Sequence, residues 1–368
     1  MKIAIIGSFF TEIPLKPGSI HAPLTLSYNL AKKLATMGHI VTYFGSYNKD
    51  IPKKKNLSFF DFKRSVVPTE LISNKDYVSS QLLVEYEQGY FSQVLDKSSD
   101  FDLIYSWYAT LIAPLSRQTV KPIVATHHDS TNIKRSLIIF EACNAKNFFI
   151  IPISKHMESI MPYKNNLSPV YNGVNVCDIP ENNPRDFFSW VGRVTPSKCL
   201  HVAIDLAKKL NFKLKIVGPM KESFADFGNV SQYVTTVQNE IKRNSNIEYL
   251  GELSHKETLE IISQSKGLIF PSSGVEACPM VPIESAVAGT PVITTDKGPL
   301  PEIIEDQITG FLSKNQREME EAIEKIATID RKKCRDCAIS RFSSDVMADN
   351  YLQQFEKAIK LNKRNNNV

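Results

Sequence analysis

Short apolar runs rich in β-branched residues alternate with helix-patterned stretches along the chain, and this alternation is the strongest constraint on its fold. About ten runs are predicted to be strands: KIAIIGSFF, HIVTYFGSY, DLIYSWY, PIVATHHD, FFIIPIS, FSWVGRV, KLKIVGP, IEYLGEL, GLIFPSS and TPVITTD. The stretches LSYNLAKKLATMG (26–38) and HVAIDLAKKLN (201–211), which lie between such runs, have helical period. Strands and helices that alternate in this way form parallel sheets covered on both faces. The sequence therefore predicts an α/β protein.

Ten strands are many for one sheet, and the 368-residue chain is long enough for two domains. The polar segment DIPENNPRD (178–186), with two prolines and no apolar period, predicts a linker. We therefore expect an N-terminal domain over 1–177 and a C-terminal domain over 187–344. The amphipathic segment 345–361 is expected to pack back on the first domain.

The pentapeptide LAKKL occurs on an early helix of each half, at 30–34 and at 206–210, as two similar units would allow. Ligands of open parallel sheets bind beyond the carboxyl ends of the strands. The expected architecture is therefore two Rossmann-like, doubly wound domains facing across a cleft.

Composition excludes several classes of protein. With 44 basic and 39 acidic residues, the net charge of +5 is too balanced for a nucleic-acid binder but suits anionic ligands. The chain starts directly with a predicted strand, and its longest apolar runs are far shorter than a membrane span. Cys334 and Cys337 form a lone CxxC without a second pair or nearby histidines. We expect a cytoplasmic protein with reduced thiols and no metal.

The stretch GRVTPSK (192–198) follows a predicted strand and precedes a predicted helix. Arg193 and Lys198 are thereby placed near a helix N-terminus, where backbone N–H groups and two cations suit a diphosphate. Two solvated loop charges are the alternative, and this stretch alone does not decide between them.

Two glutamates frame the loop after the predicted strand GLIFPSS. Glu276 is expected in the loop, free to reach a ligand, and Glu284 about one turn into the following helix. Pro279 and Pro282 suit the first turn of that helix, where a missing N–H costs little. The helix directs its positive end toward the ligand side of the sheet. Complementing the helix dipole would explain Glu284 alone, but not the pair.

GRVTPSK, EACPMVPIE (276–284), SAVAGTPVI and PEIIEDQITGFL (301–312) together resemble the retaining GT-B glycosyltransferases of glycosyltransferase family 4. Segments of the N-terminal half, such as PIVATHHD and VYNGVN, are similar to family segments in the expected order, although each is weaker by itself. The resemblance covers nearly the whole chain.

The resemblance implies a role for each matching residue. Arg193 and Lys198 would hold the donor diphosphate and stabilise it as the leaving group. Glu276 would contact the transferred sugar, and Glu284 would bind the ribose hydroxyls. The remaining implied contacts are backbone groups at Met280 and Val281, base-side groups around Gly218 and Leu250, and His128 beside the donor sugar, with its neighbour His127 as a second candidate.

Three positions depart from the family pattern. The first loop, where the family often has a Gly-Gly pair, is KPGSIHAPL here, with Gly18 and His21 as its candidate acceptor-side residues. Cys199 stands where the phosphate motif usually has glycine, and Pro279 where the second motif often has one. The first departure puts acceptor binding in doubt; the other two leave the charges in place and are expected to be tolerated.

We therefore expect a metal-independent, retaining glycosyltransferase of surface polysaccharide or glycoconjugate synthesis, with UDP favoured over GDP. Its acceptor would be a glycan, a lipid-linked molecule or a small molecule. The alternatives are a catalytically inactive nucleotide-sugar-binding subunit of a glycosyltransferase pair, an epimerase or phosphorylase of the same architecture, and a sugar receptor. Basic and apolar residues in 26–38 and 51–64 suggest weak peripheral membrane binding, with an ordinary solvated face as the alternative.

Overall fold

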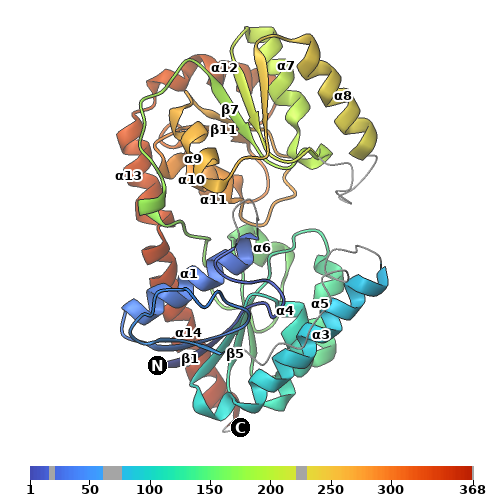
Figure 1. Cartoon of the computed structure of the whole chain (residues 1–368), viewed down its shortest axis with the longest axis vertical. Coiled ribbons are helices and arrows are strands. Elements are labelled where there is room, and N and C mark those ends of the chain that lie inside the picture. The colour runs from blue at the N-terminus through green and yellow to red at the C-terminus, as the bar shows by residue number, and fades with distance from the viewer. Residues whose placement is uncertain (16–20, 61–76, 221–229, 367–368) are drawn as a thin grey trace. The chain divides into compact units, whose positions relative to one another are not determined.

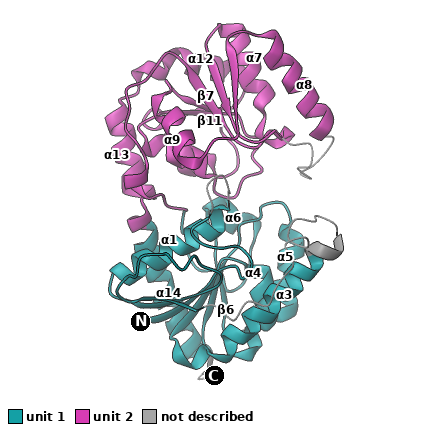
Figure 2. Ribbon diagram, in the orientation of Figure 1, with its two compact units in different colours: residues 1–171, 347–368 teal, residues 172–346 magenta. Residues whose placement is uncertain are grey.

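The computed structural model describes residues 1–15, 21–60, 77–220 and 230–366. Figure 2 shows the two compact units into which the chain divides. Met1–Tyr171 and Met347–Val368 form the first unit, and Asn172–Val346 form the second. The segment expected as a linker, 178–186, lies within the second unit, and the last helix contributes to the first.

Six parallel strands form the sheet of the first unit within the part of the chain that the structure describes (Figure 1). In chain order they are β1 (Lys2–Ile6), β2 (Ile40–Phe44), β3 (Leu57–Phe60), β4 (Leu103–Ser106), β5 (Ile123–Thr126) and β6 (Phe148–Ile151). The described helices are α1 (Ala22–Thr36), α3 (Tyr77–Asp96), η1 (Ser98–Asp100), α4 (Ala109–Ile112), η2 (Ala113–Gln118), α5 (Ile133–Cys143), α6 (Lys155–Ile160) and most of α14 (Ser344–Asn366). Strands β4, β5 and β6 are buried at every position, as helices on both faces require.

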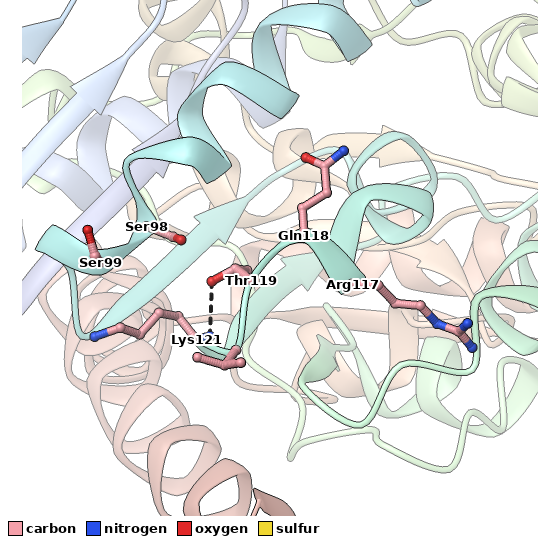
Figure 3. A pocket seen from close by; sticks show the side chains of 7 residues that line it. Ser98, Ser99, Arg117, Gln118, Thr119 and Lys121 are labelled. Carbon is pink, nitrogen blue, oxygen red and sulfur yellow. Dashed lines mark hydrogen bonds between the residues drawn. The ribbon is translucent and has the colours of Figure 1, made fainter.

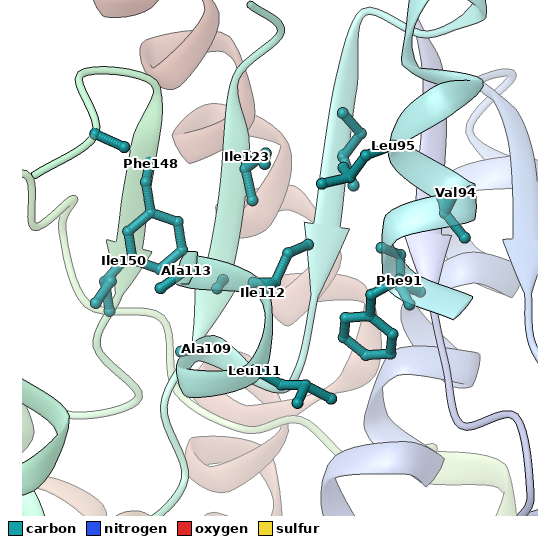
Figure 4. Close-up of a cluster of buried hydrophobic side chains, with 14 of the residues drawn as sticks. Phe91, Val94, Leu95, Ala109, Leu111, Ile112, Ala113, Ile123, Phe148 and Ile150 are labelled. Carbon is teal, nitrogen blue, oxygen red and sulfur yellow. The ribbon is translucent and has the colours of Figure 1, made fainter. Parts of the chain in front are cut away.

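Successive residues of a strand serve opposite faces of this sheet. Ile104 belongs to an apolar cluster with Phe91 of α3 and Ile112 of α4, shown in Figure 4. Its neighbour Tyr105 meets α14 instead: its ring centroid lies 5.5 Å from that of Tyr351 and 5.7 Å from that of Phe355. The first unit is therefore completed by residues from the far end of the sequence.

The sheet of the second unit is also parallel and has six described strands. They are β7 (Phe188–Val191), β8 (Leu214–Val217), β9 (Ile247–Gly251), β10 (Leu268–Phe270), β11 (Val292–Thr295) and β12 (Gly310–Ser313). Its described helices are η3 (Val176–Asp178), η4 (Pro196–Lys198), α7 (Leu200–Leu210), α8 (Val230–Arg243), α9 (His255–Gln264), α10 (Met280–Val287), α11 (Leu300–Ile303), α12 (Gln316–Lys325), η5 (Ile326–Thr328) and α13 (Arg331–Phe342).

The two sheets have the same strand order. The first is arranged β3-β2-β1-β4-β5-β6 and the second, read from its other edge, β9-β8-β7-β10-β11-β12. In each unit three strands extend to one side of the sheet and the next three to the other, which is the Rossmann order 3-2-1-4-5-6. The switch points lie between β1 and β4 and between β7 and β10. The predicted α/β class with two Rossmann-like units is confirmed.

Strands β3 and β12 are absent from the ten predicted runs, each of which contains one of the other described strands. Both lie at an edge of their sheet and are only partly buried. Strand β12 also begins with Gly310, which weakens a strand signal. The structure explains this glycine, because a Cβ there would lie 2.0 Å from the carbonyl oxygen of Val292.

The described helices contain no segment that is both long enough and apolar enough to cross a bilayer.

Candidate functional site

The GRVTPSK segment (192–198) forms the turn at the carboxyl end of β7. The N–H of Val194 donates to the carbonyl of Pro219 (3.0 Å), which fastens this turn to the segment after β8. The short helix η4 (Pro196–Lys198) separates β7 from α7, so both cations precede the long helix. Arg193 is exposed, and Lys198 is mostly buried.

Lys198 is held by a carboxylate from the neighbouring strand's loop. Its Nζ lies 2.5 Å from Oε1 of Glu276, and both side chains are largely buried. The hydroxyl of Ser272 donates to the same Oε1 (3.2 Å), and the Nζ lies 5.4 Å from the centroid of the Phe270 ring. Because β7 and β10 are adjacent, this ion pair stands at the switch point of the second sheet, where ligands of such sheets bind.

Helix α10 begins at Met280, after Pro279 as its N-cap, so Pro279 lies just outside the helix rather than in its first turn. Met280 and Val281 are partly exposed at this end, whereas Pro282 is buried. Glu284 lies one turn further on, as expected, and is 8% exposed.

The partner of Glu284 was not predicted. Its Oε1 lies 2.8 Å from Nε2 of His255, the first residue of α9. This hydrogen bond is the main cause that raises the pKa of His255. The sequence S-H-K-E (254–257) signals a capping box and thereby a helix start at His255, but nothing in it points to Glu284.

The two base-side candidates also lie at the carboxyl edge of this sheet. Gly218 follows β8 with φ 134°, and a Cβ there would lie 2.0 Å from the carbonyl oxygen of Gly192, so the close approach of the two turns requires glycine. Leu250 is half-buried near the end of β9, and the hydroxyl of its neighbour Tyr249 donates to the carbonyl of Gly218 (2.9 Å). The second unit therefore brings all eight predicted donor-binding residues to one edge.

Cys199 occupies the turn between η4 and α7 with φ 49° and ψ 41°. This is the left-handed region, which favours glycine and costs other residues about 1–2 kcal/mol. The glycine usual at this position of the motif thus has a backbone reason, and the cysteine introduces strain while leaving the two cations in place.

The acceptor-side candidates belong to the first unit. Gly18 lies outside the described residues. His21 caps α1: its Nδ1 accepts from the N–H of Leu24 (3.2 Å), and its ring meets Trp107, which follows β4, edge to face at 4.9 Å. Burial lowers the pKa of His21, so its ring is neutral at physiological pH.

The two adjacent histidines after β5 have different surroundings. His127 is 6% exposed; its Nε2 lies 3.1 Å from the hydroxyl of Ser136 on α5. His128 keeps part of its surface exposed, and its Nε2 lies 3.0 Å from the hydroxyl of Thr126. Burial, and then the charges of His127 and His21, lower the pKa of His128. The neutral, partly exposed ring of His128 is therefore the one that can meet a ligand.

A cavity of about 330 Å³ lies beside the amino ends of the strands of the first sheet (Figure 3). Ser98, Ser99 and Arg117–Lys121 line it. These residues precede β4 and β5, so the cavity opens at the amino ends of the strands, away from the switch point. We assign it no part in the candidate site.

Metal-binding clusters of three or more His, Cys, Asp or Glu side chains are not found in the described residues. All six cysteines are free. Cys334 is buried beneath α10, where burial raises the pKa of its thiol to about 12, and Cys337 lies near a carboxylate oxygen of Glu305. A thiol with so high a pKa is a poor metal ligand at neutral pH.

Residues 178–340, all of them in the second unit, match the model of the family Glycosyl transferases group 1. Solved GT-B glycosyltransferases share the fold of the whole chain, and the resemblance to GT-B group 1 glycosyltransferases is confirmed.

Particular relatives can be named. The chain is 28% identical over 310 residues to an uncharacterized glycosyltransferase of Methanocaldococcus jannaschii, MJ1178, covering 80% of this chain and 81% of that protein. AviGT4, a glycosyltransferase involved in avilamycin A biosynthesis, has a TM-score of 0.68 at 18% identity over 98% of each chain. Anabaena Alr3699/HepE in complex with UDP has a TM-score of 0.70 at 16% identity, covering 97% of this chain and 100% of that one.

Proposed function

We propose that this protein is a retaining, metal-independent glycosyltransferase of family 4. It transfers a sugar from a nucleoside diphosphate sugar, UDP rather than GDP, to a glycan, lipid-linked or small-molecule acceptor in surface polysaccharide or glycoconjugate synthesis at the cytoplasmic side of the membrane. The observation that carries the proposal is the Lys198–Glu276 ion pair at the switch point between β7 and β10. The preference for UDP is supported by Anabaena HepE, a structural neighbour seen with UDP and with UDP-glucose.

In the proposed reaction the bond between the anomeric carbon and the diphosphate oxygen breaks, and a bond from the same carbon to an acceptor hydroxyl oxygen forms on the same face. The hydroxyl proton passes to the departing phosphate oxygen. Negative charge grows on the diphosphate as it leaves, so the stabilising groups must be cationic. Arg193 and Lys198 are assigned this role, with the backbone N–H groups of Met280 and Val281.

The ion pair supplies a cation with several donors. A lysine ammonium has three N–H groups, of which Glu276 takes one. The remaining groups of Lys198 can turn to a diphosphate without breaking the pair, so the charge is already oriented before the donor binds. The carboxylate of Glu276 is assigned to the transferred sugar, whose ring gains positive character as the phosphate departs.

Glu284 is assigned to the two ribose hydroxyls and His128 to the transferred sugar. Because its pKa is lowered, His128 is neutral at physiological pH and can exchange a hydrogen bond with a sugar hydroxyl without adding positive charge. Gly18 and His21 are assigned to the acceptor side, and Gly218 and Leu250 to the base.

The test compares the two glutamates. Glu284→Gln removes charge-assisted hydrogen bonds to a group remote from the reacting carbon, so it should mainly raise the donor KM, by roughly ten- to a hundredfold. Glu276→Gln should mainly lower kcat. Because Glu276 also pairs with Lys198, this variant should leave the Kd for UDP unchanged or slightly lower, since the ammonium is freed for the diphosphate.

Kinetics with a donor panel and calorimetry with UDP measure both effects. Glu240→Gln is the matched control, because it removes a surface pair with Lys208 whose atoms lie 2.6 Å apart in the same unit. The reverse pattern, or wild-type kcat/KM in both site variants, would refute these assignments. If the protein binds UDP but neither turns over nor slowly hydrolyses any donor, it would instead be identified as an inactive nucleotide-sugar-binding subunit.

A further inference from the structure

The carboxylate assigned to the ribose is already engaged by another side chain of its own unit. Nε2 of His255 lies 2.8 Å from Oε1 of Glu284. The glutamate side chain is only 10% exposed, whereas 67% of the histidine side chain is exposed. A carboxylate accepts and does not donate, so Nε2 carries the proton in this pair.

Rigid elements fix both members of the pair. Glu284 is buried within α10. His255 is the first residue of α9, and its backbone is set by a capping box: the Ser254 hydroxyl accepts from the N–H of Glu257 (3.3 Å), and the Glu257 carboxylate accepts from the N–H of Ser254 (2.9 Å). Such a box fixes the start of a helix. The fold therefore holds the backbones of both residues in place for this contact.

We propose that His255 is a positioning residue that orients the Glu284 carboxylate for the ribose of the donor nucleotide. This inference rests on the proposed function. Two vicinal hydroxyls need both carboxylate oxygens in one fixed plane. His255 occupies one acceptor position on Oε1 and leaves Oε2 and the second position on Oε1 for the nucleotide. Without it, the carboxylate can rotate about its last bond and lose this geometry.

The charge of His255 gives the contact a pH dependence. The charged groups around His255 are Glu284 of α10, Asp178 of η3, and Lys256 and Glu257 of its own helix. The hydrogen bond to Glu284 raises the pKa of His255, burial opposes this, and the charges of Glu284 and Asp178 act in the same direction as the bond. Below pH 6.5 the contact is therefore an imidazolium–carboxylate pair, and once the pH exceeds the raised pKa of His255 it is a neutral hydrogen bond, which is roughly half as strong.

The experiment measures binding of UDP and of inorganic pyrophosphate to the full chain by calorimetry at pH 6, 7.5 and 9. Pyrophosphate has no ribose, so it reports on the phosphate site alone. His255→Ala should raise the Kd for UDP roughly tenfold at pH 6 and leave the Kd for pyrophosphate unchanged. His255→Gln keeps a neutral donor near the Nε2 position, so it should bind UDP within about threefold of the wild type at pH 9 and weaken less with rising pH.

Lys256→Ala is the matched control, since it removes an exposed charge from the next position of α9, and it should follow the wild type. With the donor sugar, His255→Ala should raise KM and leave kcat unchanged. Thermal unfolding of each variant reports on folding separately.

Two results would overturn the inference while the proposed function stands: equal UDP affinity of His255→Ala and wild type at every pH, or equal losses for UDP and pyrophosphate. If the wild type binds no nucleoside diphosphate, the proposed function fails and this inference fails with it.

Discussion

Glu87 of α3 is a buried carboxyl at the switch point of the first unit, and its titration should be visible in stability. It is 2% exposed and accepts a hydrogen bond from the N–H of Phe9 (3.0 Å), in the loop that follows β1. Burial raises the pKa of Glu87 to about 7, although hydrogen bonds from Ser8 and Phe9 act in the opposite direction.

The sign and size follow from linkage. Between the ordinary carboxyl pKa of 4.5 and the folded value of about 7, the folded state holds a proton that the unfolded state has lost. This contribution to stability is therefore fully present below pH 4.5 and is lost as the pH rises through 7. Each pKa unit corresponds to about 1.4 kcal/mol, so the full loss is on the order of 3 kcal/mol.

The proposed substitution is Glu87→Gln. Glutamine is neutral and has the same shape, and its side-chain carbonyl can still accept the hydrogen bond from the N–H of Phe9. At pH 5 the variant and the wild type should unfold within about 1 kcal/mol of each other, since both side chains are neutral. At pH 8.5 the variant should be more stable by on the order of 2–3 kcal/mol, which amounts to several degrees in Tm for a unit of this size.

Thermal unfolding of the full chain at the two pH values measures this difference. If the two units melt separately, only the transition of the first unit should shift. Glu141→Gln on α5 of the same unit is the control, because this glutamate is exposed. Its stability relative to the wild type should be the same at both pH values. A variant destabilised equally at pH 5 and pH 8.5 would show that Glu87 is ionised in the folded protein and that the reasoning is wrong.

Three further predictions follow from other parts of the molecule. Cys199→Gly should raise the free energy of unfolding by up to about 1 kcal/mol by relieving the left-handed backbone, whereas Asn211→Gly, at φ 52° just after the other end of α7, should gain less because asparagine tolerates this conformation. Turnover should survive EDTA, since Arg193 and Lys198 are proposed to supply the positive charge; loss with EDTA and recovery with Mg²⁺ would contradict this. The basic and apolar segments 26–38 and 51–64, of which residues 61–64 lie outside the described part of the chain, should bind anionic vesicles weakly in co-sedimentation at low salt, and replacing exposed Lys53–Lys55 by glutamine should abolish this binding; absence of binding even at low salt would remove the idea.

The fold was predictable because the central strands of both sheets are buried on both faces. Runs such as FSWV and LIYS are apolar enough to mark strands, and helical period marks the segments between them. Strands β3 and β12 were missed; both are partly exposed, and β12 begins with glycine.

The residues of the candidate site were predictable where they belong to a motif that is continuous in the sequence. Glu276, Glu284 and Lys198 lie on strand-end loops and α10, and the parallel topology gathers them at one edge. The contacts among them were not predictable. Lys198 and Glu276 are 78 residues apart in the sequence, and His255 and Glu284 are 29 residues apart. Local sequence patterns do not reveal contacts between residues so far apart. The strain at Cys199 was hidden as well, because a departure from glycine shows its cost only when φ is known.

The return of α14 to the first unit has a consequence for biosynthesis. Tyr105 of β4 is covered by Tyr351 and Phe355, yet 172–346 are translated between them. At ~5–20 residues per second the ribosome needs on the order of 10–35 s for this stretch. The second unit is continuous in sequence and can finish folding first, while the nascent first unit waits with an open apolar face. We expect this waiting intermediate, rather than either finished unit, to be the species that engages chaperones in the cell.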